Sequence, residues 1–183
     1  MWTIAGVLFA VASLGIHYQV KFRMHQGQAG GSIRQMGNVK VGEAAPDFSL
    51  PDLTSQAVTL SSFRRQKVLL LDFWATWCGP CKMAMPGLQT LQQEFKDRGF
   101  EIISVNQGEA ADQVRSFIGR KKYSFHVVLD KDQAVGNKYG VRAIPTLVVV
   151  DKHGLIQWLH VGYSEDTAEL RQLVQRLIQE EKP

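Results

Sequence analysis

The chain has 183 residues, of which 45% are hydrophobic and 21% are charged, a balance typical of one globular domain with a short additional segment. The formal net charge is +4, but residues 1–43 hold four basic residues and one acidic residue, so the remainder is nearly neutral. A nucleic-acid surface needs clustered basic residues on the folded part, so we expect no nucleic-acid partner. The chain has two cysteines and no second spaced pair of cysteines or histidines near them, so we expect no structural zinc site.

The first 20 residues favour a membrane anchor. Residues 2–20 contain no charged side chain and would form a helix of roughly 28 Å, close to the thickness of the hydrocarbon layer. A cleaved signal peptide is the alternative, but a charged start is missing and the small residues around Ala10 come too early for its cleavage site. Residues 21–43 are rich in Gly, Gln and basic residues, which predicts a flexible tether. The folded domain is then expected at 44–183.

Within this domain, apolar periodicity predicts strands and helices in turn. The expected strands are residues 47–50, 57–60, 68–74, 101–106, 126–129, 146–150 and 155–161. The expected helices are residues 78–98, 110–121 and 135–139, and a last one that contains residues 170–178. This order predicts an α/β sandwich around a central mixed sheet.

The two cysteines, Cys78 and Cys81, stand directly after a predicted buried strand and at the start of a predicted helix. Free N–H groups and the helix dipole favour an anion at this position, and the thiolate is the form of cysteine that attacks disulfides. Gly79 and Pro80 keep the turn between the two sulfurs compact. We therefore expect a redox-active disulfide, with Cys78 as nucleophile and Cys81 as the thiol that resolves the mixed disulfide, and no other cofactor.

The segment from Asp72 to Met83, DFWATWCGPCKM, resembles the active-site segment of thioredoxin. The segments at 45–48, 105–109 and 125–130 resemble the TlpA/ResA-like family of membrane-tethered thioredoxins, and together these similarities cover nearly all of 44–183. The resemblance implies a thioredoxin-like three-layer sandwich with a strand-bearing N-terminal extension and an inserted helix and strand. It also implies a protein disulfide reductase.

The resemblance assigns roles to further residues. Asp72 would be the buried acid that relays a proton to or from Cys81, although an acid in a strand can also lie at the sheet edge and reach water. Pro145, after Ile144, would be the cis-proline that faces the cysteines and helps to bind a client polypeptide as an added strand. A trans proline that starts a strand is the alternative. Trp77 would shield the sulfurs and offer an apolar contact to clients.

The resemblance also implies clients and a location. Family members reduce protein disulfides outside the cytoplasm, often in apocytochrome c, with electrons from a transmembrane thiol donor. They tend to carry Asn where this chain has Asp72 and Glu where it has Gly79, so a general reductant of several clients is an equal expectation. Lys21 and Arg23 follow the apolar segment, and the positive-inside rule alone would place the domain in the cytoplasm. We follow the family here and expect an extracytoplasmic domain.

Two other functions fit parts of the sequence. A peroxiredoxin-like peroxidase shares the opening of the domain at 45–48, but its PxxxTxxC pattern is absent around Thr76. A non-enzymatic module could use the cysteine pair to bind a metal or to assemble a complex. Catalysis of insulin reduction, with dithiothreitol as the reductant, would distinguish a disulfide reductase from both of these alternatives.

Overall fold

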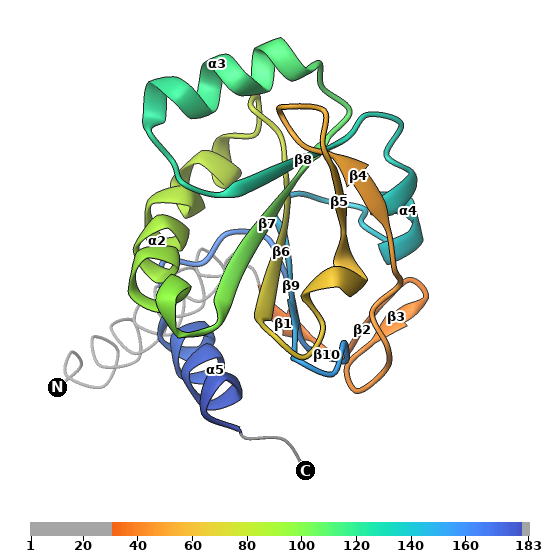
Figure 1. Cartoon of the computed structure of the whole chain (residues 1–183), viewed down its shortest axis with the longest axis vertical. Coiled ribbons are helices and arrows are strands. Elements are labelled where there is room, and N and C mark those ends of the chain that lie inside the picture. The colour runs from red at the N-terminus through yellow and green to blue at the C-terminus, as the bar shows by residue number, and fades with distance from the viewer. Residues whose placement is uncertain (1–30, 181–183) are drawn as a thin grey trace, which may run out of the picture.

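A computed structural model describes residues 31–180 of the chain (Figure 1). Its strands are β1 (Gly31–Ile33), β2 (Gln35–Met36), β3 (Val39–Lys40), β4 (Ser49–Pro51), β5 (Ala57–Thr59), β6 (Val68–Trp74), β7 (Phe100–Gln107), β8 (His126–Asp130), β9 (Thr146–Val150) and β10 (Ile156–Val161). Its helices are α2 (Gly79–Phe95), α3 (Ala111–Lys121), α4 (Ala134–Tyr139) and α5 (Ala168–Gln179), with 3-10 turns η1 (Leu60–Phe63) and η2 (Lys96–Arg98). The elements predicted from the sequence are all present, close to their expected positions.

Six strands form the central sheet in the order β1-β10-β9-β6-β7-β8. The sheet is mixed, because β6 pairs in parallel with β7 and antiparallel with β9. All seven residues of β6 are buried, which is why its sequence is an almost unbroken apolar run rather than an alternating one. The strand that leads into the cysteine pair is therefore held on both edges and covered on both faces.

The sheet separates two apolar cores. One core joins the sheet to α2, α3 and α5 through residues such as Leu88, Phe117 and Val174. The other joins it to α4 and the N-terminal strands β2–β5 through residues such as Phe48 and Tyr139. In Figure 1, α2 and α5 lie on one side of the sheet, and α4 with the small strands lies on the other. The predicted three-layer sandwich is confirmed.

The predicted tether is wrong for residues 31–43, because this segment belongs to the domain. Strand β1 pairs antiparallel with β10 and extends the central sheet, and β2 and β3 form a small hairpin. Met36 and Val39 are buried in the second core. Gly37 packs directly on Gly140, and a Cβ on Gly37 would lie 2.8 Å from the Cα of Gly140.

The predicted anchor and the first part of the tether fall in residues 1–30, outside the described residues. None of the helices between residues 31 and 180 has the length and apolar character needed to cross a membrane.

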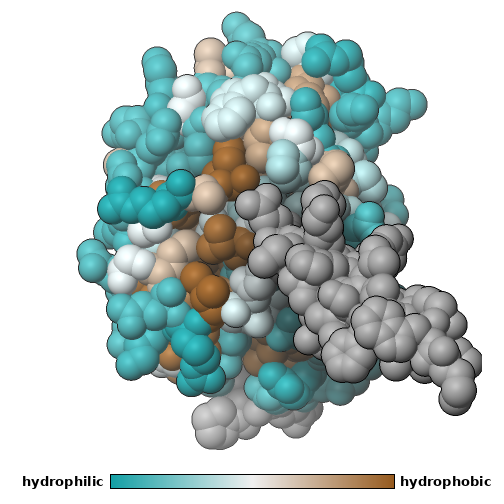
Figure 2. All heavy atoms as spheres, turned by 180° about the vertical axis from the view of Figure 1, so that it is seen from behind, coloured by the Kyte–Doolittle hydropathy of each residue, from teal (hydrophilic) through white to brown (hydrophobic). Residues whose placement is uncertain are grey.

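Most of the surface is hydrophilic in the view from behind, where apolar residues gather in one band (Figure 2). Within the described part of the chain, the large hydrophobic side chains that are exposed are Ile33, Trp77 and Met83. Two of these three, Trp77 and Met83, lie within five residues of Cys78 in the sequence. Exposed apolar groups are therefore concentrated near the cysteine pair.

Candidate active site

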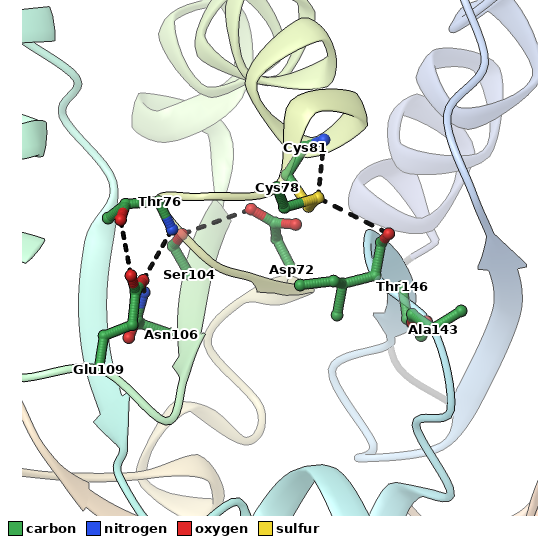
Figure 3. Close-up of a disulfide and its surroundings, with 10 residues drawn as sticks. Asp72, Thr76, Cys78, Cys81, Ser104, Asn106, Glu109, Ala143 and Thr146 are labelled. Carbon is green, nitrogen blue, oxygen red and sulfur yellow. Dashed lines mark hydrogen bonds between the residues drawn. A yellow bond between two sulfur atoms is a disulfide. The ribbon is translucent and has the colours of Figure 1, made fainter.

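The two cysteines form a disulfide at the junction between β6 and α2 (Figure 3). Cys78 caps the helix, and its sulfur accepts a hydrogen bond of 3.1 Å from the backbone N–H of Cys81. Pro80 stands in the first helical turn, where a backbone N–H has no partner within the helix. In the reduced protein, the same N–H donor and the helix dipole favour the thiolate of Cys78.

Burial distinguishes the two sulfurs only slightly. Cys78 is 4% exposed and Cys81 is 1% exposed. Gly79 lies outside Cys81 on the exposed side of the turn, and a Cβ added there would meet no atom within 4 Å. The turn between the two cysteines is therefore open to solvent at Gly79, and Cys78 is the slightly more exposed of the two cysteines.

The loop before β9 faces the disulfide. The peptide bond between Ile144 and Pro145 is cis, as predicted. The carbonyl oxygen of Ile144 lies 3.7 Å from the sulfur of Cys78. The loop is held by two further hydrogen bonds: Gly162 donates its N–H to the Pro145 carbonyl at 2.8 Å, and Thr146 donates its hydroxyl to the Ala143 carbonyl at 2.6 Å.

Asp72 lies in the middle of the central strand β6, and its carboxyl group points toward the disulfide (Figure 3). It is 2% exposed, and its side-chain partner is the hydroxyl of Ser104, which donates a long hydrogen bond of 3.4 Å. The alternative of an acid at a sheet edge in contact with water is wrong, because β7 and β9 flank this strand.

The buried environment of Asp72 disfavours the charged form of its carboxyl group. Burial raises the pKa of its carboxyl group from 3.8 to about 7, and the hydrogen bond from Ser104 offsets only part of this effect. Removing a charge from water without a charged partner is costly, so the neutral acid is favoured. Near neutral pH this group can therefore either hold or accept a proton.

A second buried acid, Glu109, holds the loop that carries the cysteine pair. It precedes α3 and is 7% exposed. Its carboxylate accepts hydrogen bonds from the backbone N–H of Thr76 at 2.7 Å and from the Thr76 hydroxyl at 2.6 Å. The side-chain amides of Asn106 and Gln113 donate to the same carboxylate at 2.7 Å and 2.5 Å.

Glu109 is not among the site residues predicted from the sequence. Its contacts with Thr76 join residues 33 positions apart, and nothing in a single sequence reports that distance. The available signal was its place inside the segment 105–109, which carries part of the family resemblance. Figure 3 shows that this carboxylate fixes the chain two residues before Cys78, so Glu109 is a positioning residue.

Trp77 and Trp74 have opposite environments. Trp74 is fully buried and packs on Phe117 at 5.4 Å between ring centroids, so it belongs to the core. Trp77 is 69% exposed and lines a cavity of about 370 Å³ beside Ile144. This exposure suits the predicted apolar contact with clients, and shielding of the sulfurs by Trp77 stays a prediction.

The side chains of the described residues do not form a metal-binding cluster. Between residues 31 and 180, no three His, Cys, Asp or Glu side chains lie close enough to hold a metal ion. The two cysteine sulfurs are bonded to each other.

The fold and this site define a thioredoxin-like thiol-disulfide oxidoreductase, and comparison with known proteins agrees. The Redoxin family model matches residues 40–177, and the chain belongs to that family. Thiol-disulfide oxidoreductase ResA of Geobacillus kaustophilus is 40% identical over 124 residues, which are 68% of this chain and 71% of ResA. Thioredoxin-like protein YneN of Bacillus subtilis is 37% identical over 134 residues, 72% of this chain and 76% of YneN.

Solved structures give the same result. A crystal structure from Chlorobium tepidum, assigned to thiol:disulfide interchange protein DsbE, is 32% identical and has a TM-score of 0.72. The alignment covers 77% of this chain and 99% of that chain. The protein is therefore a thiol-disulfide oxidoreductase, and its two cysteines form a disulfide at the site described above.

Proposed function

We propose that this protein is a membrane-tethered protein disulfide reductase whose domain works outside the cytoplasm. The disulfide reductase activity is supported by the position of Cys78, whose sulfur accepts a hydrogen bond from a backbone N–H at the start of α2 and lies 3.7 Å from the carbonyl oxygen of Ile144. A thiolate at this point is stabilised and lies beside backbone groups that can bind an extended client.

The reaction has two exchange steps. The Cys78 thiolate attacks one sulfur of a client disulfide, forms a mixed disulfide and displaces a client thiolate, which takes a proton from water. Cys81 then loses its proton, and its thiolate attacks the Cys78 sulfur. The Cys78–Cys81 disulfide forms and the second client thiolate leaves. The client has gained two electrons and two protons, and a donor dithiol must reduce the protein again.

Asp72 supplies the base for the second step. Cys81 is buried and must be deprotonated before it can attack, yet water has little access to it. A carboxyl group with a pKa near 7 is ionised in about half of the molecules at neutral pH and can accept this proton. Asp72 then releases the proton after the client leaves. The resolving step is expected to depend on Asp72 more than the first attack does.

The membrane tether and the client proteins follow from the first 20 residues and from the family resemblance. The uncharged stretch of residues 2–20 supports an anchor, and family resemblance supports an extracytoplasmic domain that receives electrons from a transmembrane thiol donor. Apocytochrome c and a broader set of proteins that carry disulfides are both suitable clients. A reporter fused after residue 183 tests the orientation, because activity of an export-dependent reporter requires an extracytoplasmic C-terminus.

The mechanism is tested with single cysteine variants in the insulin reduction assay. We expect Cys78→Ser to abolish reduction, and Cys81→Ser to accumulate mixed disulfides with insulin chains that appear on a non-reducing gel. Full activity in both variants would disprove the mechanism.

The direction of the reaction is tested by the reduction potential of the Cys78–Cys81 pair. A value near that of thioredoxin, about −270 mV, marks a reductant, whereas a value near −120 mV would mark an oxidant.

A further inference from the structure

We propose that the cavity beside Cys78 selects clients that carry an acidic residue near the disulfide, and that Arg142 is the residue that recognises it. This inference rests on the proposed disulfide reductase function and names the chemistry of its clients. We call this hollow of about 370 Å³ the Arg142 cavity; it is lined by Trp77, Gln107, Gln133, Asn137, Arg142 and Ile144, among others.

The Arg142 cavity adjoins the reacting sulfur. Ile144 lines it, and the carbonyl oxygen of the same residue lies 3.7 Å from the sulfur of Cys78. A client bound as an extended strand beside this loop places alternate side chains on one face, roughly 6.5 Å apart. The client residue two positions from the reacting cysteine therefore reaches the cavity.

The positive charge of Arg142 is not neutralised by a carboxylate among the described residues. Arg142 is exposed, and none of the ion pairs formed by the described residues involves it. No described Asp or Glu lines the Arg142 cavity. A guanidinium without a carboxylate partner at the edge of a binding cavity favours an anionic side chain and disfavours a Lys or Arg on the client.

Asp130 contacts two residues that line the Arg142 cavity, Gln107 and Gly136, but does not itself line the cavity. It is buried, and its carboxylate accepts hydrogen bonds from the Gln107 side chain at 2.9 Å, from Val135 N–H at 3.1 Å and from Gly136 N–H at 2.7 Å. Gly136 permits this packing, since a Cβ there would lie 2.2 Å from the amide oxygen of Gln107. Asp130 thus positions the side-chain amide of Gln107 in the lining of the cavity and forms no ion pair with Arg142. Arg142 therefore remains available to a client.

The remaining lining suits a polypeptide rather than a small inorganic anion. The indole of Trp77 is 69% exposed and offers an apolar face to a client side chain. Gln133 and Asn137 are exposed and supply amide donors and acceptors for a client backbone. An Asp or Glu side chain of the client combines an aliphatic stem for Trp77 with a carboxylate for Arg142.

The test uses peptides with one cysteine activated as a 2-pyridyl disulfide, which carries no charge of its own. Attack by the Cys78 thiolate on the peptide sulfur releases pyridine-2-thione, whose absorbance gives the rate constant. The full-length protein is reduced beforehand and kept in a non-ionic detergent. Matched peptides carry Asp, Asn or Lys two positions before or after the cysteine.

We expect the Asp peptide of one series to react roughly three- to tenfold faster than its Lys counterpart, as for a partly screened ion pair. Salt of about 1 M should remove most of this difference, because the Debye length falls to about 3 Å. Arg142→Gln should remove the preference and Arg142→Glu should reverse it. The matched control Arg98→Glu changes the same charge in η2, beyond the C-terminal end of α2, and should keep the preference of the wild type.

Equal rates for Asp and Lys peptides in both series would overturn the proposal while leaving disulfide exchange intact. A preference that survives in Arg142→Glu would also overturn it. No reaction with any activated peptide would instead refute the disulfide reductase function itself, so the two failures are distinguishable.

Discussion

Replacing Asp72 by Asn should make the protein more stable and less active. The carboxyl group has a pKa of about 7 in the folded protein against 3.8 in an unperturbed chain. Between these two values the unfolded chain is ionised while the folded protein keeps its proton, so unfolding releases a proton and stability falls as the pH rises. The amide introduced by Asp72→Asn cannot ionise, so this variant avoids the loss.

The size of the effect follows from the two pKa values. They differ by about three pH units, and each unit corresponds to about 1.4 kcal/mol. As the pH rises from 4 to 7, the free energy of unfolding of Asp72→Asn should therefore increase by about 4 kcal/mol relative to that of the wild type. Urea unfolding of the oxidised form of both proteins at several pH values measures this difference. Use of the oxidised form excludes titration of the cysteines.

Two further results complete this test. Ser104→Ala removes the hydrogen bond that lowers the Asp72 pKa, and should move the pH dependence of stability to a higher pH. In the reduced protein, Asp72→Asn should slow the release of client from the mixed disulfide while the first attack by Cys78 is little changed. If the stability difference between Asp72→Asn and wild type is independent of pH, the carboxyl group is not neutral in the folded protein and the proton relay fails.

Two other substitutions test the positioning of the site and of the N-terminal segment. Glu109→Ala leaves the N–H and hydroxyl of Thr76 without their acceptor. We expect the free energy of unfolding in urea to fall by about 1–3 kcal/mol, and alkylation of Cys78 to become slower. The control Gln113→Ala removes one donor only and should have a smaller effect on both quantities. Gly37→Ala places a Cβ 2.8 Å from Gly140 at a φ of +52°, and should lower stability by about 1–3 kcal/mol; an unchanged midpoint of unfolding would mean that the β2–β3 hairpin is not part of the cooperative domain.

The sequence predicted the parts of the fold whose physics is local. Strand β6 is buried on both faces and so reads as a continuous apolar run, and α5 places Leu170, Leu173 and Leu177 at helical spacing against the sheet. Strands β1–β3 have two or three residues each, too few for a periodic signal. The one local signal was Met36-Gly37-Asn38-Val39, a two-residue turn between apolar residues that is typical of a hairpin.

The same distinction holds within the site. The position of the cysteines after a strand, the acid inside an apolar run and the Ile144–Pro145 pair are visible along the chain, and the structure brings them together. Glu109 and Arg142 act across the fold: one binds a loop 33 residues away, and the other lines a cavity that also contains Trp77.

These two long-range residues divide the work of the site in a way that the cysteine motif cannot encode. In the proposed mechanism the motif and Asp72 determine the chemistry of exchange, which is the same for every disulfide. Glu109 fixes the chain before Cys78 through a buried carboxylate that accepts hydrogen bonds from inside the protein, and it does not line the Arg142 cavity. Arg142 lies outside this network and is exposed. We therefore expect substitutions at Arg142 to change the choice of client without altering how Cys78 is held.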